Sequence, residues 1–345
     1  MGFIIQGIGS SVPQHSVTQF EAANFLTQGS EDEKQAHLLQ RLFRKTGIQK
    51  RHIAWRSNSL KIPNNLGGTR DRMCYFENAA PALSIAAASN AIKQSGIPIS
   101  QISHLITASC TGFFAPGIDI ALIKALELST SVSRTNVGFM GCHGAFNGLK
   151  VAAGLCGDGE SALLVCTELC SLHVQASQLE QHAVANSLFA DGAAAVVGTQ
   201  CQSNDLALTS SISKIVPDSE ELMSWKVTDT GFVMTLSPHV SEVIANELHN
   251  LISPWLSTHA LRIEDIGGWA IHPGGPKILE VIAETLGLSE EQMSASRKIF
   301  TEYGNMSSPT VLFILEELLR QRISPPFVML GFGPGLAIEA ILFTK

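Results

Sequence analysis

Short apolar runs alternate along the chain with longer segments of helical periodicity. The apolar runs predict strands at residues 3–9, 104–108, 137–140, 163–166, 192–198, 266–271, 327–331 and 336–343. The longer segments predict helices at residues 79–94, 145–156, 240–252, 277–286 and 310–319. Because strands and helices alternate in both halves, we expect an α/β fold in which helices cover both faces of the sheet.

Two helix starts have signals of their own. Thr18 and Glu21 have the spacing of a capping box, which predicts a helix that begins there. Ser308 is the expected cap of the helix at 310–319, with Pro309 in its first turn.

The chain has 345 residues, a length that suggests roughly two domains. Residues 200–205 are polar and form the most natural boundary. We therefore predict an N-terminal half at 1–200 and a C-terminal half at 201–345.

Composition and charge narrow the class of protein. With 45% hydrophobic and 15% charged residues, the chain can bury a large core. The net charge of −7 argues against binding nucleic acid or a membrane surface, because both partners need a basic face. The apolar runs are shorter than the ~20 residues that cross a bilayer. No basic stretch precedes an apolar segment at the N-terminus, so we expect a cytoplasmic protein without a secretory signal.

The seven cysteines give little sign of a disulfide framework or a metal site. Their number is odd and the chain is large, which makes disulfides improbable. Neither Cys-x-x-Cys nor His-Glu-x-x-His occurs in the sequence. Cys166 and Cys170 lie four residues apart, but their apolar neighbours indicate a buried strand that runs into a loop. We therefore expect no metal.

Three short segments carry residues suited to chemistry, and each lies where a strand-like apolar run ends and a helix-like pattern begins. Cys142 stands between two glycines at the start of a helix, where the helix dipole and free amides favour a thiolate. His272 follows a strand and precedes Pro-Gly-Gly-Pro, and a neutral imidazole can assist proton transfer from a thiol. Asn305 lies in a glycine-containing turn, where its amide can donate to an oxyanion. Each alone is more simply a core cysteine or a turn residue, whereas the three together indicate an acyltransferase that forms carbon–carbon bonds.

Six segments spread over nearly the whole chain resemble the type III polyketide synthases, the chalcone/stilbene-synthase-like branch of the thiolase superfamily. They are residues 44–48, 141–142, 187–194, 272–276, 302–308 and 331–336. Glu-Tyr-Gly-Asn-Met-Ser-Ser and Gly-Phe-Gly-Pro-Gly-Leu are the most specific of them. The second of these lies between two predicted strands, so it is not a dinucleotide site.

The resemblance implies a duplicated αβαβα thiolase-like fold, a homodimer and a catalytic set of Cys142, His272 and Asn305. It also implies that coenzyme A thioesters, acyl-CoA and malonyl-CoA, are used as substrates without a carrier protein or a permanently bound cofactor. Cys142 would take the starter acyl group, and His272 and Asn305 would hold the thioester oxygen of malonyl-CoA while carbon dioxide leaves. Repeated condensation and cyclisation would follow.

Basic residues match family positions that bind coenzyme A. Arg41 and Lys45 lie four apart on one face of a predicted helix, although a solvated basic face would look the same. A third basic position of the family is Leu38 here. Lys277 stands where the family often uses only backbone contacts, and its side chain would add charge.

Several residues match positions of the family's substrate pocket. Phe189 matches one gatekeeper phenylalanine, and the second aligns with Met234 rather than with the nearby Phe232. Other pocket positions are expected at Cys110, Cys170, His173, Trp225 and Ser307, with Ala115 where plant enzymes donate a methionine across the dimer.

The pocket residues resemble bacterial members and argue against a chalcone or stilbene product. Trp225 stands where plant enzymes have glycine and would fill much of a chalcone-sized cavity. The smaller residues elsewhere favour fatty acyl starters that give alkylpyrones or alkylresorcinols. A small aromatic product made from malonyl units is the next choice.

Two other functions remain open at this point. A ketoacyl synthase III-like condensing enzyme, which initiates chains on acyl carrier protein, shares the same three residue types. A catalytically silent thiolase-fold partner subunit is the alternative from another class, but it would have no reason to keep Cys142, His272 and Asn305 together.

Overall fold

Strands from both halves of the chain build one mixed sheet. The structure is a computed structural model that describes residues 2–27, 33–55, 66–175, 180–202 and 205–345. Nine strands follow the order β11-β12-β13-β8-β1-β7-β6-β4-β5. The strands of the first half are β1 (Gly2–Ser11), β4 (Ile102–Ser109), β5 (Ser133–Gly138), β6 (Ser161–Leu169) and β7 (Asp191–Cys201). Those of the second half are β8 (Ala207–Ile215), β11 (Gly268–Ile271), β12 (Phe327–Gly333) and β13 (Ala337–Thr344).

The sheet consists of two groups of strands that meet at a short seam. β1 and β8 pair only at Phe3 with Leu208 and at Ile4 with Ala207. By contrast, β1 runs antiparallel to β7 along nearly its whole length, and β13 does the same with β8. The seam therefore divides the sheet between the two halves of the chain. Residues 203–204, in the expected boundary, lie outside the described part.

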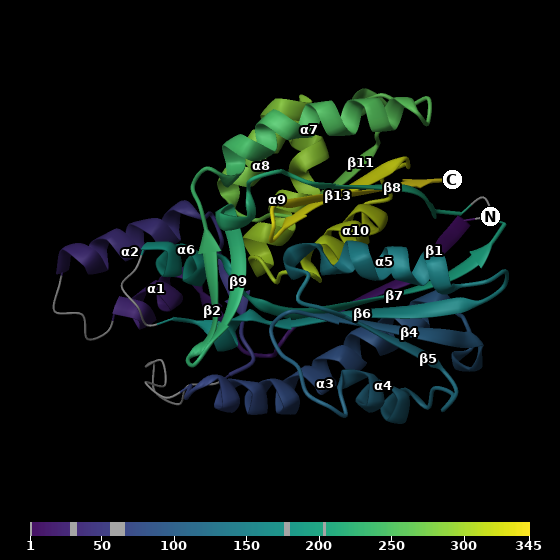
Figure 1. The fold of residues 1–345 in the computed structure, drawn as a ribbon, viewed down its shortest axis with the longest axis horizontal. Helices are drawn as coiled ribbons and strands as arrows, with labels where there is room; N and C mark the ends of the chain where they lie inside the picture. The colour runs from purple at the N-terminus through teal and green to yellow at the C-terminus, as the bar shows by residue number, and fades with distance from the viewer. Residues whose placement is uncertain (1, 28–32, 56–65, 176–179, 203–204) are drawn as a thin grey trace.

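Helices form three further layers, which Figure 1 shows from top to bottom. One outer layer holds α7 (Val240–Ser257) and α8 (Pro276–Leu286) over the second group of strands. A middle layer of α5 (Gly144–Leu155) and α10 (Thr310–Arg320) lies between the groups. The other outer layer holds α3 (Thr69–Ser95) and α4 (Ile118–Leu126). The layers confirm the predicted αβαβα order of a thiolase-like fold.

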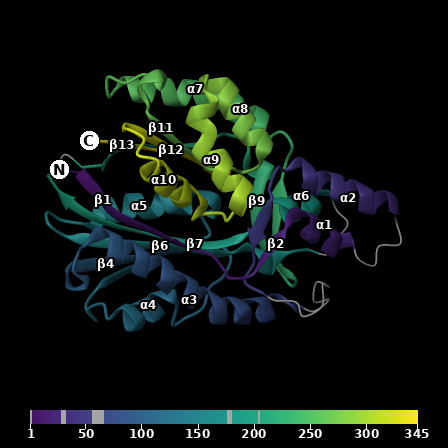
Figure 2. The same ribbon diagram turned by 180° about the vertical axis from the view of Figure 1, so that it is seen from behind.

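Smaller elements gather at one end of these layers, around the cavities described below. They include α1 (Gln19–Thr27), α2 (Glu33–Lys45), α6 (Glu180–Leu188), the pair β2 (Ser16–Thr18) and β3 (Lys50–His52), and the pair β9 (Met223–Thr228) and β10 (Gly231–Leu236). Figure 2 shows α1, α2 and α6 together at this end when the molecule is seen from behind. The helix α9 (Glu290–Tyr303) instead packs beside β11 and α10.

The middle layer is apolar because both of its helices are covered on two sides. Phe146 and Leu149 of α5 have no exposed surface, and neither do Leu312 and Ile314 of α10. Packing on two sheet faces explains why the segment at 145–156 carries so little charge. Within the described ranges, no helix combines the length and apolar character that a bilayer crossing needs.

Local predictions at helix and strand ends have mixed outcomes. Thr18 and Glu21 form the predicted capping box, with the Thr18 amide donating to Glu21 at 2.7 Å and the Glu21 amide donating to Thr18 Oγ1 at 3.1 Å. The expected cap at Ser308 is wrong, because its hydroxyl donates to the Glu168 carboxylate at 2.6 Å and Pro309 takes the N-cap position. The strand predicted at 137–140 ends at Gly138, because Phe139 turns the chain with a φ of 56°.

Candidate active site

Cys142, His272 and Asn305 line one cavity of about 780 Å³. They come from three separate places, which are the turn before α5, the end of β11 and the turn after α9. Each is almost fully buried. The structure therefore brings together the three residues that the sequence singled out.

Cys142 lies in a single 3₁₀ turn, Gly141–His143, that leads directly into α5. Gly141 has a φ of 69°, and a Cβ there would lie 2.5 Å from Pro334 Cδ. Glycine thus lets the Pro334 loop pack against the turn that carries the thiol.

Burial opposes the thiolate that the local sequence favours at Cys142. Burial raises the pKa of the thiol to about 11, the hydroxyl of Ser307 lowers it, the charge of Glu168 raises it further, and the side chain of Asn305 lowers it. Loss of hydration outweighs the helix dipole, since the cysteine is 7% exposed. In the unloaded site, burial therefore favours the neutral thiol.

His272 is a buried imidazole whose ring nitrogens have no hydrogen-bond partner among the described residues. Its backbone N–H donates to the Leu330 carbonyl at 2.8 Å, which ties the residue to β12. Burial lowers the pKa of the ring to about 3, with nearby His143 lowering it further, so the ring is neutral at physiological pH. Buried polar atoms without partners are rare in proteins, and these two are available to a thiol and a substrate oxygen.

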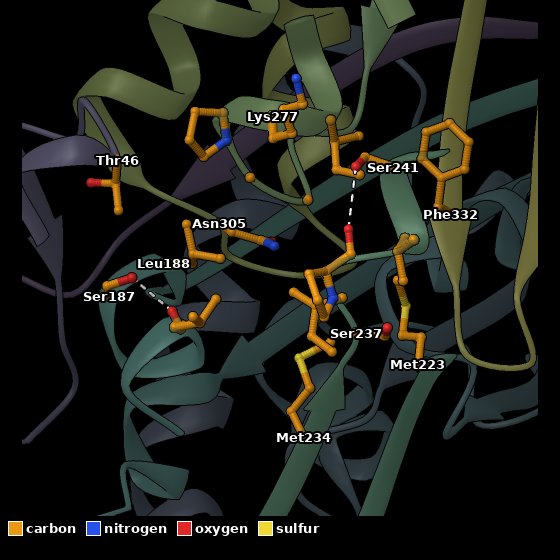
Figure 3. A pocket seen from close by; sticks show the side chains of 18 of the residues that line it. Thr46, Ser187, Leu188, Met223, Met234, Ser237, Ser241, Lys277, Asn305 and Phe332 are labelled. Carbon is orange, nitrogen blue, oxygen red and sulfur yellow. Dashed lines mark hydrogen bonds between the residues drawn. The ribbon is translucent and has the colours of Figure 1, made fainter. Parts of the chain in front are cut away.

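Asn305 has a fixed orientation. Its Oδ1 accepts the backbone N–H of Ser307 at 2.7 Å, which leaves the NH₂ group free to donate. Figure 3 shows the nitrogen directed into the cavity beside Leu188. Two backbone bonds hold the residue, because its N–H donates to Leu188 at 2.9 Å and its carbonyl accepts from Ala190 at 2.8 Å.

The raised pKa of Cys142, about 11, gives a pH-dependence prediction. Below that pKa, each unit of pH raises the thiolate fraction about tenfold. We therefore expect iodoacetamide labelling of Cys142 to rise steadily from pH 7 to pH 10 (about tenfold per unit). Peptide mass spectrometry separates this site from exposed Cys74, and Cys142→Ala supplies the blank. Labelling that is already maximal at pH 7 would show a preformed thiolate and contradict the prediction.

Glu168 is a buried carboxylate near the thiol that the sequence reasoning missed. It accepts hydrogen bonds from the Cys110 amide at 3.0 Å and from the hydroxyls of Thr111 at 2.7 Å and Ser308 at 2.6 Å. Burial raises its pKa, and these donors lower it. A single charged residue in the otherwise uncharged, mostly apolar strand β6 was the signal that could have revealed it.

The predicted pocket residues surround the thiol side of the cavity. Phe189 and Met234 line the main cavity. A void of about 20 Å³ beside Cys142 is lined by residues that include Cys110, Cys170, Trp225 and Ser307. His173 borders another void of about 30 Å³. Voids of this size hold about one water each, so little space remains behind the thiol.

An aromatic wall made of His173, Trp225 and Phe232 closes this inner end. The rings of His173 and Phe232 stack at 4.2 Å, and Trp225 meets both edge-on. Trp225 Nε1 donates to the Cys110 carbonyl at 2.7 Å, His173 Nε2 donates to the Thr111 carbonyl at 2.6 Å, and the Phe232 amide donates to His173 Nδ1 at 3.0 Å. Hydrogen bonds to the backbone therefore fix the rings of Trp225 and His173, and the Phe232 ring stacks against His173.

The outer end of the cavity carries exposed cations. Lys45 at the end of α2 and Lys277 at the start of α8 both line it. Arg41 is exposed one helical turn before Lys45 but is not among the lining residues, and Leu38 is 63% exposed. The segment from Thr235 to Ser241 also lines the cavity. The sequence reasoning missed this segment because it predicted no element between residues 198 and 240.

Comparisons with known proteins place the chain in a family. Residues 3–201 match the N-terminal domain of the chalcone and stilbene synthases, and residues 207–345 match the C-terminal domain. The chain therefore belongs to the chalcone and stilbene synthase family, and it is a type III polyketide synthase. Such enzymes are acyltransferases that catalyse decarboxylative condensation.

Individual relatives cover nearly the whole chain. It is 33% identical to the alpha-pyrone synthesis polyketide synthase-like Pks18 of Mycobacterium tuberculosis, over 99% of this chain and 90% of that protein. It is 30% identical to the 3,5-dihydroxyphenylacetyl-CoA synthase of Streptomyces toyocaensis, over 98% of this chain and 89% of that protein.

Solved structures agree with the sequence relatives. PKS-I from the brown alga Ectocarpus siliculosus superposes with a TM-score of 0.94 at 30% identity, covering 100% of this chain and 98% of that one. The C-terminal type III polyketide synthase domain of Steely1 from Dictyostelium superposes with a TM-score of 0.94 at 28% identity, covering 100% of this chain and 99% of that one. The predicted fold and reaction class are confirmed.

Proposed function

We propose that Cys142, His272 and Asn305 are the catalytic residues of this synthase, acting directly on coenzyme A thioesters. The observation that carries the proposal is their convergence on one cavity, where both ring nitrogens of His272 lack partners among the described residues. In the loading step the Cys142 sulfur attacks the starter thioester and its proton passes to His272. The carbon–sulfur bond to coenzyme A breaks, and the free thiol leaves with that proton.

Chain extension uses His272 and Asn305 as hydrogen-bond donors. When malonyl-CoA loses carbon dioxide, the electrons of the broken carbon–carbon bond form an enolate. The Asn305 amide and His272 donate to its oxygen, where the charge appears only during reaction. The enolate carbon then attacks the acyl thioester on Cys142, and the cysteine sulfur leaves. Transfer of the longer chain back to Cys142 prepares the next round.

Lys45 and Lys277 support a role in holding the coenzyme A phosphates, because both are exposed at the outer end of the cavity. Arg41 would extend the same basic surface along α2. Replacing Lys45 and Lys277 together by glutamine is expected to raise the KM for malonyl-CoA about threefold to tenfold with kcat little changed. The effect should shrink at high salt. Exposed Lys124, on α4 in the opposite outer layer, is the matched control, and an equal effect of Lys124→Gln would refute phosphate binding at this mouth.

The aromatic wall supports short starters and a small product. The pocket residues alone put fatty acyl starters first, but voids of about 20 Å³ and 30 Å³ behind the thiol leave no room there for an alkyl tail. The curated relatives include an alpha-pyrone synthase-like protein and a dihydroxyphenylacetyl-CoA synthase. We therefore place malonyl-derived pyrones or small aromatic compounds before long-chain products.

Removing the indole of Trp225 is expected to reverse this preference. In Trp225→Ala, the kcat/KM ratio of octanoyl-CoA to acetyl-CoA as starter should rise by about tenfold or more. Trp225→Phe keeps most of the wall and should stay near the wild type. Because Trp225 is half-buried and its truncation removes packing from the wall, thermal unfolding is followed alongside. Efficient use of octanoyl-CoA by the wild-type enzyme would contradict the closed wall.

The homodimer implied by the resemblance remains a proposal, supported by the open edge of the sheet at β5. β5 is an edge strand, and next to it Phe113, Phe139 and Met140 are exposed. An open edge beside apolar side chains favours pairing with a second copy. Sedimentation of the purified protein decides between one and two copies of the 36.9 kDa chain.

A further inference from the structure

Arg51 is a buried arginine that lies behind the catalytic cavity and is not one of its lining residues. It belongs to the short strand β3 and is 5% exposed. One of its guanidinium nitrogens, Nη1, donates to the backbone carbonyls of Asn186 and Phe189, each at 2.7 Å. These two carbonyls flank the last turn of α6, so one side chain ties β3 to the end of that helix.

The segment that Arg51 holds is the one that carries Asn305. Phe189 and Asn305 form a parallel bridge, in which the Asn305 amide donates to Leu188 and the Ala190 amide donates to Asn305. Figure 3 shows Leu188 and Asn305 next to each other at the cavity wall. A shift of residues 188–190 would therefore move the carboxamide of Asn305.

Arg51 also packs against the residue before Asn305. Gly304 has a φ of 73°, and a Cβ added there would lie 3.0 Å from Arg51 Cγ and 3.0 Å from the Leu188 carbonyl. The arginine stem and the α6 end thus confine Gly304 from two sides. Asn305 is held by its backbone bridge to residues 188–190 and by this contact with Gly304.

The surroundings keep the guanidinium charged although it is buried. Burial lowers the pKa of Arg51 to about 10, and the carboxylate of Asp191 raises it, so the group stays protonated at pH 7. The Phe43 ring lies 5.5 Å from the guanidinium carbon. Asp191 is itself fixed by the backbone N–H groups of Ala54 at 2.6 Å and Ser171 at 2.7 Å. A lysine at this position would keep the charge, but its ammonium nitrogen ends one bond short of Nη1, the single nitrogen that donates to both carbonyls.

We propose that Arg51 is a positioning residue that holds the Phe189–Asn305 bridge and thereby aims the Asn305 amide at the enolate oxygen. The inference rests on the proposed role of Asn305. It predicts that Arg51 affects malonyl-CoA decarboxylation, which uses the amide, and spares loading of Cys142, which depends mainly on the thiol and His272.

The test measures the two half-reactions separately in Arg51→Lys. Intact-protein mass spectrometry follows acylation of Cys142 by acetyl-CoA, and carbon dioxide release follows malonyl-CoA decarboxylation. We expect Arg51→Lys to lower kcat for decarboxylation by about tenfold, with its KM and the acylation rate within about twofold of wild type. Arg72→Lys is the matched control, because Arg72 is also buried and donates to the backbone carbonyls of Leu172 and Val174. It should leave the ratio of the two rates unchanged.

A double-mutant cycle separates positioning from a general loss of structure. In an Asn305→Ala background, Arg51→Lys should change decarboxylation by less than about twofold, because the group it positions is absent. A full additional tenfold loss in that background, or no loss in the single variant, would overturn the inference. If Asn305→Ala alone leaves decarboxylation unchanged, the proposed role of Asn305 fails instead. Arg51→Gln, read in the same way, replaces Arg51→Lys if the lysine variant does not fold.

Discussion

Replacing Cys142 by alanine is expected to lower product formation by about a thousandfold or more, because no other group can carry the acyl chain between rounds. The same variant should still release carbon dioxide from malonyl-CoA, since that step uses His272 and Asn305. The measurement is the rate of polyketide formation beside the rate of carbon dioxide release, from one enzyme preparation. The prediction is thus a separation of the two activities and not a general loss.

A buried cysteine away from the cavity provides the control for Cys142. Cys156 ends α5, is 7% exposed like Cys142 and packs in the central apolar core. Cys156→Ala removes a thiol of similar burial from the opposite end of α5 and should leave both rates near wild type. Product formation by Cys142→Ala at the wild-type rate would show that no covalent acyl-enzyme forms on this residue.

Asn305→Ala is expected to lower kcat for malonyl-CoA decarboxylation by about a hundredfold to a thousandfold, the range for loss of one oxyanion donor. The amide N–H groups stabilise the negative charge of the enolate only as it forms, so KM should change much less than kcat. Loading of Cys142 by acetyl-CoA should remain. Stopped assays of carbon dioxide release and intact-protein mass spectrometry report the two steps.

Asn305→Asp distinguishes hydrogen-bond donation from simple space filling. Aspartate has nearly the shape of asparagine, but it replaces two N–H donors by an acceptor and adds negative charge beside the enolate. It should therefore be as slow as Asn305→Ala or slower. Activity close to wild type in Asn305→Asp would mean that the amide donates nothing to the reaction.

Cys142, His272 and Asn305 could be predicted from the sequence because each of them has a local signal. All three lie where an apolar run or a helix meets glycine, and such junctions occur at the edge of a layered α/β fold. Periodicity likewise predicted most of the strands of the sheet and the helices α3, α5, α7, α8 and α10, but it did not predict β8, α4 or α9. The convergence of the three residues on one cavity depended on both halves of the chain packing around a shared middle layer.

Other parts of the site depend on long-range contacts that no local pattern reveals. Arg51 is one basic residue in a polar stretch until the fold places it behind Phe189 and Gly304. The raised pKa of Cys142 follows from its burial and from Glu168 on β6, whereas the local sequence suggested only the favourable helix end. The aromatic wall joins His173 to Trp225 and Phe232, which are more than fifty residues further along the chain.

Mass spectrometry of the enzyme and its products, after incubation with acetyl-CoA and malonyl-CoA labelled with carbon-13, tests the central claim most directly. We predict acyl adducts on the Cys142 peptide and products that gain one labelled acetate unit per round without any carrier protein. Adducts without extension until malonyl-carrier protein is added would instead identify a chain-initiating ketoacyl synthase. No adduct and no product under either condition would indicate a subunit without condensing activity.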